Sequence, residues 1–432
     1  MQKRLVGVSF GVFLFLSSAK AQVLSFEELW ENYKNHSFEM QAAEKELEAS
    51  TLAKKRADLH WLPRVYVGGQ WFTTNDPGQV FFNNLGQRAI TQMDFVPGEL
   101  NRPGMRTFKA GNLGLDLPLY EGGMKVAQVS LLRQMLKASE AEAKAKKTAE
   151  YGELSRRYGS LMVREQIIVN LKSLQTELKK IMSGYQVGAK SNPVGYSGLL
   201  GLKGVANRIE ALLIQHNLQI ETDRKWINEK AKISQAGWKP DLKKGLNSFL
   251  KDQYQSTSGS ALSSELLAAS LKAETLYHMA EMEKARFLPR VGVFAQNNLY
   301  SGNRDTENSQ SLGLYLMWEL FNPDSYGRNS EAQARAMAAE AKIKNARLDE
   351  SIALAKLIDS KSALEMGLKL LDDSDALLGE QSINAMKLFR SGLLSALQLT
   401  EVISRRIDLI EEKSQTQTNY LEVTSRIHQI RN

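Results

Sequence analysis

One stretch of the chain, residues 311–321, alternates leucine or tryptophan with other residues at every second position. Successive side chains of a β-strand point to opposite faces of a sheet, so this stretch predicts a strand with one apolar face. The same alternation occurs in residues 112–120. The apolar positions of the two stretches are Leu312, Leu314, Leu316, Trp318 and Leu320, and Leu113, Leu115, Leu117 and Leu119.

Two environments would select such a face. Leucine is not among the residues that favour strands, so a leucine-rich face indicates selection by the surroundings. A strand in an outer membrane meets lipid on one side and water on the other. A soluble sheet that is packed on one side has the same alternation. The two strands alone leave both environments open, and the segments around them decide between the two.

The bulk composition excludes several classes of protein. The chain has 432 residues, of which 24% are charged, so it is neither a disordered chain nor a helical membrane protein. The net charge is +8, but no Lys/Arg stripe is interleaved with aromatic residues, and we do not expect nucleic-acid binding. The absence of cysteine excludes disulfides, thiolate metal sites and a lipid-modified N-terminal cysteine.

The N-terminus has the features of an export signal. Lys3 and Arg4 precede a largely apolar run, residues 5–16, and Ala19-Lys20-Ala21 is a small-x-small cleavage site. We therefore expect residues 1–21 to be removed as a signal peptide. A helix needs about 20 apolar residues to span a membrane, and no later stretch reaches that length. Any membrane-embedded part of the mature chain is therefore expected to be a β-barrel.

The first half of the mature chain predicts helix, strand, loop, strand, long helix, turn and helix. Ser25 and Glu28 form a capping-box pattern at the start of a helix that we expect to end at His60. At about 1.5 Å per residue the long helix would extend on the order of 95 Å, more than a compact domain needs. The expected elements are a strand over 65–72, a turn-rich loop over 74–107 with Phe81, Phe82 and Phe95 as anchors, a strand over 112–120, a proline-free helix over 124–188 and a returning helix over 194–238.

The second half repeats this order. Phe287-Leu288-Pro289-Arg290-Val291 matches Trp61-Leu62-Pro63-Arg64-Val65, and Leu312-Gly313-Leu314 matches Leu113-Gly114-Leu115. The expected elements are a helix over 260–286, strands over 291–295 and 311–321 with a short loop over 300–310, a long proline-free helix with a coiled-coil seam, and a last helix over 396–430. The seam consists of Leu357, Leu364, Leu368, Leu371 and Leu378.

The duplication divides the chain into two structural repeats. We assign residues 22–238 to the first repeat, residues 239–259 to a linker rich in Lys, Gly and Ser, and residues 260–432 to the second repeat. Four strands cannot close a barrel, and open strand edges are not tolerated in lipid. Closure would need several copies: two would supply about eight strands, and three would supply about twelve and leave room for a lumen.

In the order of these motifs the chain resembles the TolC-like outer-membrane efflux family, over nearly all of the mature chain and in both halves. The resemblance implies a mainly α-helical trimer, in which a twelve-stranded membrane β-barrel is continued by an α-helical coiled-coil tunnel across the periplasm. It implies an exit duct in the outer membrane of a Gram-negative bacterium, which receives cargo from an inner-membrane transporter through a periplasmic adaptor in tripartite efflux or type I secretion. The motifs are Leu62-Pro63-Arg64 and Leu288-Pro289-Arg290, Leu117 to Gly123, Tyr185-x-x-Gly188-x-x-Ser191 and Phe389-x-x-Gly392-x-x-Ser395.

The resemblance also implies roles for residues at the two helical turns. Relatives have two aspartates just after the second turn, and the matching residues here are Gln398 and Glu401. Only Glu401 would place an acidic ring at the periplasmic gate, which makes strong cation selectivity doubtful. Both turns also have the ordinary pattern of a helix end. The residues implied in adaptor docking are Tyr185, Gly188, Lys190, Ser191, Phe389, Arg390, Gly392 and Ser395.

Two other readings of the chain were weighed. A periplasmic coiled-coil adaptor or structural protein would share the helical hairpins, but it would not need two leucine-faced strand pairs. An enzyme would need a converging polar cluster, and the five histidines, His36, His60, His216, His278 and His428, are scattered without ligand spacing. We therefore expect no catalytic residues, cofactor or metal. Asp372, Asp373 and Asp375 are interpreted as a solvated face or, alternatively, as charges that line the tunnel.

Overall fold

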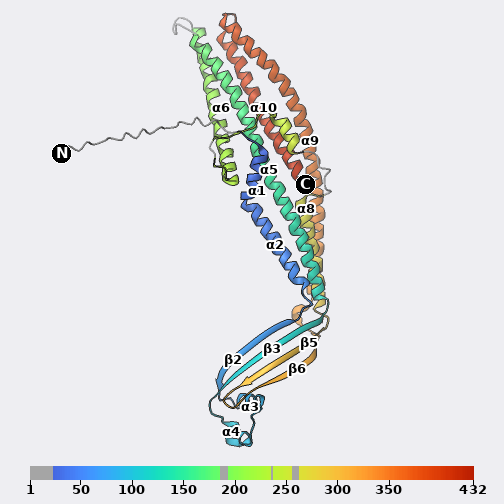
Figure 1. Ribbon diagram of the computed structural model, residues 1–432. Helices are drawn as coiled ribbons and strands as arrows, with labels where there is room; N and C mark the ends of the chain where they lie inside the picture. Colours follow the sequence, from blue (N-terminus) through green and yellow to red (C-terminus); the bar gives the residue numbers. More distant parts are fainter. Residues whose placement is uncertain (1–22, 185–192, 235–236, 255–261) are drawn as a thin grey trace, which may run out of the picture. The chain divides into compact units, whose positions relative to one another are not determined.

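The computed structural model of the chain describes residues 23–184, 193–234, 237–254 and 262–432 (Figure 1). The predicted signal peptide, residues 1–21, lies outside the described residues. The chain forms two compact units, and each takes residues from both halves of the sequence. The helical unit contains Met1–Gln41, Lys146–Ala261 and Ser351–Asn432, and the sheet unit contains Ala42–Ala145 and Leu262–Glu350.

The element order repeats as the sequence predicts. The first half contains α2, β2, β3, α5 and α6, and the second half contains α8, β5, β6, α9 and α10. The bounds of these elements are Phe38–Asp58, Arg64–Thr74, Arg106–Glu121, Met124–Gly184 and Pro193–Ala231, and then Ser264–Ala285, Arg290–Ser301, Thr306–Met317, Arg328–Arg390 and Ala396–Arg431. Among the described residues, no helix combines the length and the apolar character that a membrane crossing requires.

The N-terminal helix begins with the predicted capping box but is interrupted before its expected end. The Ser25 hydroxyl accepts from the Glu28 N–H, and the Glu28 carboxylate accepts from the Ser25 N–H. The helix α1 (Phe26–His36) ends at Ser37, which has an extended backbone. The Ser37 hydroxyl then accepts from the N–H of Met40 in α2. One serine therefore divides the expected helix into two.

The segment predicted as a linker, residues 239–259, contains ordered elements where it is described. A short strand, β4 (Lys239–Pro240), pairs in parallel with β1 (Val23–Leu24), and α7 (Gly245–Gln253) follows. Two side chains of α7, Phe249 and Leu250, are buried, although the segment is rich in Lys, Gly and Ser. The returning helix α6 also ends earlier than expected, since Lys232 has a left-handed backbone with φ 53°.

Aromatic side chains form the core of the helical unit. Phe26 contacts Tyr158 and Phe249 edge to face, and Tyr158 stacks on Trp238. The Tyr158 hydroxyl donates to the carbonyl of Leu24 at 2.9 Å and accepts from the Asp241 N–H at 2.9 Å. One tyrosine of α5 therefore bonds both to β1 and to the residue that follows β4.

The sequence predicts a turn-rich loop between β2 and β3, but this segment contains ordered helical elements. They are α3 (Pro77–Gly86), the 3-10 turn η1 (Gln92–Phe95) and α4 (Pro97–Asn101). Asp76 caps α3 by accepting from the Gln79 N–H. Phe81 contacts both Phe82 and Phe95, but Phe82 and Phe95 are exposed and do not anchor the loop in a core. The buried side chains in this segment include Val80, Asn84, Gln87 and Asp94.

The second strand pair has a much shorter connection than predicted. β5 continues to Ser301 and β6 begins at Thr306, so only residues 302–305 form the turn. β6 ends at Met317, opposite Arg290, and not at Phe321. The residue before Arg290 is Pro289, which has no N–H to pair with a longer β6. Trp318 donates instead from its ring nitrogen to the carbonyl of Phe287.

Candidate functional site

Four antiparallel strands form one sheet in the order β2-β3-β5-β6 (Figure 1). Residues that face each other across an antiparallel pair lie on the same face of the sheet. The register places Val65 opposite Leu115, Leu115 opposite Ala295 and Ala295 opposite Leu312. The apolar positions paired in this register therefore lie on one face, as the alternation predicts. Leu119 is the exception, because a β-bulge between Pro118 and Tyr120 shifts the register and places Tyr120 opposite Val291.

This apolar face is exposed within the chain. Val67 is 82% exposed and Leu312 is 78% exposed. The other large apolar side chains exposed on this face of the strands are Val65, Trp71, Leu113, Leu299, Leu314 and Leu316. Exposed apolar patches of this extent indicate a surface that another molecule or a lipid phase covers.

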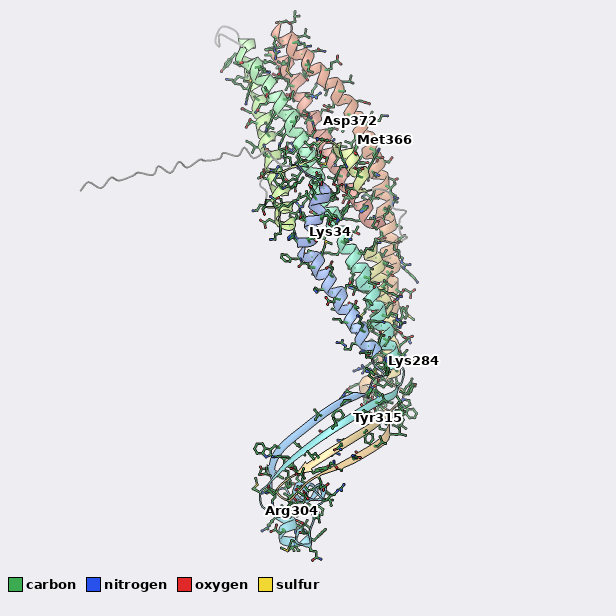
Figure 2. All side chains as sticks on the ribbon, viewed as in Figure 1. Lys34, Lys284, Arg304, Tyr315, Met366 and Asp372 are labelled. Carbon is green, nitrogen blue, oxygen red and sulfur yellow. The ribbon has the colours of Figure 1, made fainter. Side chains whose placement is uncertain are left out.

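The opposite face is polar and is closely packed by aromatic rings over glycines. Tyr66 lies over Gly114, Tyr315 over Gly292 and Phe294 over Gly313, so near that a Cβ at any of these glycines would collide with the ring. Figure 2 shows Tyr315 on the sheet. Covering a glycine with a cross-strand aromatic ring restores the packing that the glycine lacks.

Amide side chains lie further along this polar face. They line a shallow cavity of about 400 Å³ together with Tyr300. Within it the Gln296 amide donates to the Asn298 side-chain oxygen at 2.9 Å. The amides are Gln70, Asn112, Gln296 and Asn298. One sheet therefore has an apolar face and a face that hydrogen-bonds to water.

The sheet is open at both edges. Among the described strands, β2 pairs only with β3 and β6 pairs only with β5. Each outer edge therefore has backbone N–H and C=O groups that face away from the sheet. Exposed aromatic residues gather where the strands lead into the helices, a position typical of a membrane–water interface. They include Trp61, Tyr120, Phe287, Trp318, Phe321 and Tyr326.

The second helical turn has the geometry that the sequence predicts for a helix end. α9 ends in a Schellman motif: the Gly392 N–H donates to the Phe389 carbonyl and the Leu393 N–H to the Leu388 carbonyl. Gly392 has φ 77°, a left-handed backbone that glycine adopts without strain. The Arg390 guanidinium pairs with Glu177 of α5 at 3.0 Å. The first turn, with Tyr185, Gly188, Lys190 and Ser191, lies outside the described residues.

Gln398 and Glu401, the two predicted gate residues, have different local partners. Ser395 is the N-cap of α10, and the Gln398 side chain accepts from the Ser395 N–H at 3.0 Å, which completes a capping box. Gln398 therefore has a structural partner that sequence reasoning missed, although the Ser-x-x-Gln spacing could have shown it. Glu401 is exposed and pairs with Arg405, one turn further along α10, at 2.5 Å.

The acidic cluster at residues 372–375 is mostly paired. Asp375 pairs with Arg406 at 3.0 Å and with Lys413 at 3.0 Å, and Asp372 pairs with Lys413 at 2.7 Å. Burial by itself would lower the pKa of Lys413, but hydrogen bonds to the two aspartates outweigh it and raise that pKa. Asp373 is exposed. Asp372 and Asp375 therefore link α9 to α10 and do not form a purely solvated face.

Helix α9 has a second apolar stripe that the sequence analysis did not single out. The predicted seam leucines are buried or half-buried, which agrees with packing on one face. Ile352, Met366, Leu370 and Leu377 recur at helical spacing on the opposite face and are all more than half exposed. Figure 2 shows Met366 and Asp372 on α9. Four large apolar side chains exposed on one face of a helix indicate a contact surface.

Among the described residues, no group of three or more His, Asp or Glu side chains could hold a metal ion. No protein-family model and no curated protein sequence matches the chain. Solved structures do match it. The open state of the MtrE outer-membrane channel of Neisseria gonorrhoeae has a TM-score of 0.74 at 11% identity, covering 94% of this chain and 88% of that chain.

Two further structures show the same similarity. The CmeC outer-membrane channel of Campylobacter jejuni has a TM-score of 0.72 at 12% identity, covering 100% of this chain and 95% of that chain. The outer-membrane protein VceC of Vibrio cholerae has a TM-score of 0.67 at 15% identity, covering 93% of this chain and 94% of that chain. The chain has the fold of these outer-membrane channels.

This similarity confirms the predicted fold of the chain, in which strand pairs are joined to long helical hairpins. The matched portions include the strands as well as the long helices, since they cover nearly the whole chain. A helical hairpin protein without the sheet would not match over this length.

Proposed function

We propose that this chain is one subunit of an outer-membrane exit duct in a Gram-negative bacterium. Three copies would join their sheets into a closed cylinder of twelve strands, and their long helices would form a periplasmic tunnel. The duct would pass cargo from an inner-membrane transporter to the outside, as part of a tripartite efflux or type I secretion system. The fold shared with outer-membrane channels supports this proposal.

The observation that carries the proposal is the two-faced sheet. An apolar surface such as Val67, Leu312 and Leu314 is unfavourable in water by about 25 cal/mol for each Å² exposed. Lipid removes this penalty and leaves the amide-lined face to water. The open edges of β2 and β6 support assembly, because an unpaired backbone group costs several kcal/mol in lipid.

The exposed stripe of α9, Ile352, Met366, Leu370 and Leu377, supports the same assembly in the helical unit. A stripe of this kind packs against another helix when it repeats at helical spacing. In a homotrimer each α9 would contact a helix of a neighbouring copy through it. The same oligomer would then pair the backbone groups at the sheet edges and bury the apolar side chains of the α9 stripe.

The helical turns are the proposed docking points for a periplasmic adaptor. Phe389, Arg390, Gly392 and Ser395 form an ordered turn, and Leu393 and Leu397 beside it are exposed apolar side chains. Tyr185, Gly188, Lys190 and Ser191 are the matching docking residues of the first turn. An ordered turn with exposed apolar residues offers a partner a surface that needs little reorganisation on binding.

The gate proposal rests on Glu401, because Gln398 is engaged in the capping box. Arg405 offsets part of the charge of each Glu401. We therefore propose a gate of weak cation selectivity. Glu401→Gln should change single-channel conductance and divalent-cation block, and unchanged values would remove Glu401 from the constriction. The duct itself needs no catalytic activity, since the transporter would supply the energy.

Membrane fractionation tests the proposed function. The full-length chain should be found in the outer membrane as an oligomer that shifts on heating in SDS. The purified oligomer should form ion-conducting pores in planar lipid bilayers. A soluble monomer that never inserts would overturn the proposal and favour a periplasmic coiled-coil adaptor or structural protein.

Crosslinking tests the docking surface separately. The chain contains no cysteine, so Arg390→Cys provides a single attachment point for a crosslinker. This variant should capture a periplasmic adaptor in intact cells. A matched cysteine at Asp58, near the strands, should capture none. Equal capture from both positions would show that the turn is not the docking site.

A further inference from the structure

The long loop between β2 and β3 is tied to the opposite strand pair by an ion pair between the buried Asp94 and the exposed Arg304. Figure 2 shows Arg304 at the end of the sheet, in the β5–β6 turn. Its guanidinium donates two hydrogen bonds to the Asp94 carboxylate, at 2.6 and 2.7 Å. Arg304 also donates to the carbonyl of Ala89 at 2.9 Å. Asp94 is 9% exposed and also accepts from the Thr91 N–H. A two-point arginine–carboxylate pair fixes orientation as well as distance.

Neighbouring contacts extend this attachment. The Gln87 side chain accepts from the Asp305 N–H at 3.2 Å and lies against Gly302. Arg88 donates to the carbonyl of Asn308 in β6 at 3.3 Å. The loop starts from the edge strand β2 and therefore reaches across the sheet end to the other edge strand. Residues 86–89 and Asp94 are therefore the docked part of the loop, whereas residues 91–93 between them are exposed.

The loop lies on the polar side of the sheet. Gly86 packs directly on the ring of Tyr300, which belongs to the polar face. Phe108, on the same face, is 2% exposed. Trp71 and Leu299 are the adjacent residues on the apolar face, and they are 77% and 46% exposed. The end of the sheet is therefore covered on one face only.

We propose that residues 75–105 fold inward over the polar face and that the Arg304–Asp94 pair holds them there, so that the loops of three copies narrow the duct at this end. This inference rests on the proposed function, because the polar face becomes the inner wall only when copies close the cylinder. The loop is then a fixed constriction, and its removal widens the mouth.

A cysteine pair tests the loop position without reference to conduction. Gln87→Cys and Gly302→Cys replace two residues that touch, in a chain with no other cysteine. Oxidation should form an intramolecular disulfide in the membrane-inserted protein. Failure of this bond to form in the assembled protein would overturn the docked position of the loop.

Conductance tests the narrowing. Arg304→Ala should raise single-channel conductance, by roughly twofold or more for a constriction that limits current. In the Arg304→Ala background with the cysteine pair, oxidation should return the conductance to the original value and reduction should raise it again. Arg102→Ala, an exposed arginine of the same loop, should leave the conductance unchanged.

The outcomes separate the two proposals. If the original protein conducts but Arg304→Ala and a deletion of residues 78–101 conduct equally, the loop does not narrow the duct. If the original protein forms no pores, the proposed function is wrong, and disulfide formation still reports whether the loop is docked. The reversed pair, Asp94→Arg with Arg304→Asp, should restore the original conductance if the ion pair itself holds the loop.

Discussion

The helical unit and the four-stranded sheet use the same apolar residue types in opposite ways. Leu29, Tyr33, Leu154 and Trp238 are completely buried in the helical unit. Many leucines and valines of the sheet, such as Val67, Leu312 and Leu314, are exposed on one face. The helical unit thus has a core made by one chain, whereas the sheet depends on its surroundings to cover its apolar face. The hydrophobic effect therefore packs side chains of one chain together in the helical unit, whereas in the sheet it favours contact with whatever surrounds the chain.

The largest expected effect is a cavity in the helical unit. Leu154→Ala removes a side chain that is 0% exposed and should lower the free energy of unfolding by about 2–5 kcal/mol. Leu312→Ala, on the exposed face, leaves no cavity and should lower it much less. Thermal unfolding of both variants in detergent micelles measures the difference. Equal losses would contradict the contrast between the two regions.

A charge on the apolar face should disturb the sheet almost as strongly. Leu314→Arg places a guanidinium where lipid is expected, at about 2–4 kcal/mol near the middle of a bilayer. Ser311→Arg places the same charge on the polar face of the same strand, where water can solvate it. The amount of heat-shifted oligomer in the outer-membrane fraction compares the two. Equal loss from both variants would show that the faces are not distinguished by lipid.

A smaller effect is expected at the start of α10, in the helical unit. Ser395→Ala removes the hydroxyl that accepts from the Gln398 N–H and should destabilise the helix start by about 1 kcal/mol. Hydrogen exchange of the first α10 amides should become faster. Ser391→Ala, a serine of the same turn that bonds to a carbonyl, should change these amides little. Slow exchange in Ser395→Ala would mean that the cap is unimportant.

The smallest effect is expected for the Arg304–Asp94 ion pair of the sheet unit under mild acid. Hydrogen bonds from Arg304 outweigh burial and hold the pKa of Asp94 well below its ordinary value of about 3.9. The pair therefore contributes stability above pH ~4 and loses it only as the pH falls through the lower folded pKa. Protease resistance of residues 75–105 should not change between pH 7 and 4.5. Cleavage that begins near pH 5 would contradict this strong pairing.

Sequence reasoning succeeded where structure depends on local periodicity. Alternation placed Leu312, Leu314 and Leu316 on one face, and the capping-box pattern placed Ser25 at a helix start. The predicted ends of elements were wrong where a single residue or a partner distant in the sequence sets the end. Ser37 divided an expected helix, and Pro289 shortened β6 through a missing N–H.

Of the candidate site, sequence reasoning likewise predicted the features that depend on local sequence and missed those that depend on packing. The Gly392 turn followed from glycine's tolerance of a left-handed backbone, a local property. The exposed stripe of α9 could have been found from its spacing, but its exposure depends on which face the chain packs. Sequence position likewise suggested a gate role for Gln398, whereas its side chain completes a cap.

By itself the sequence determined the faces of the strands, the long helices and their duplication, because side-chain periodicity acts over a few residues. Only the tertiary structure decided that the long loop lies over the polar face, because Asp94 and Arg304 are far apart in the chain and meet only where the β2–β3 loop reaches the β5–β6 turn. A buried carboxylate such as Asp94 requires a hydrogen-bonding partner, and only the folded chain brings Arg304 to it.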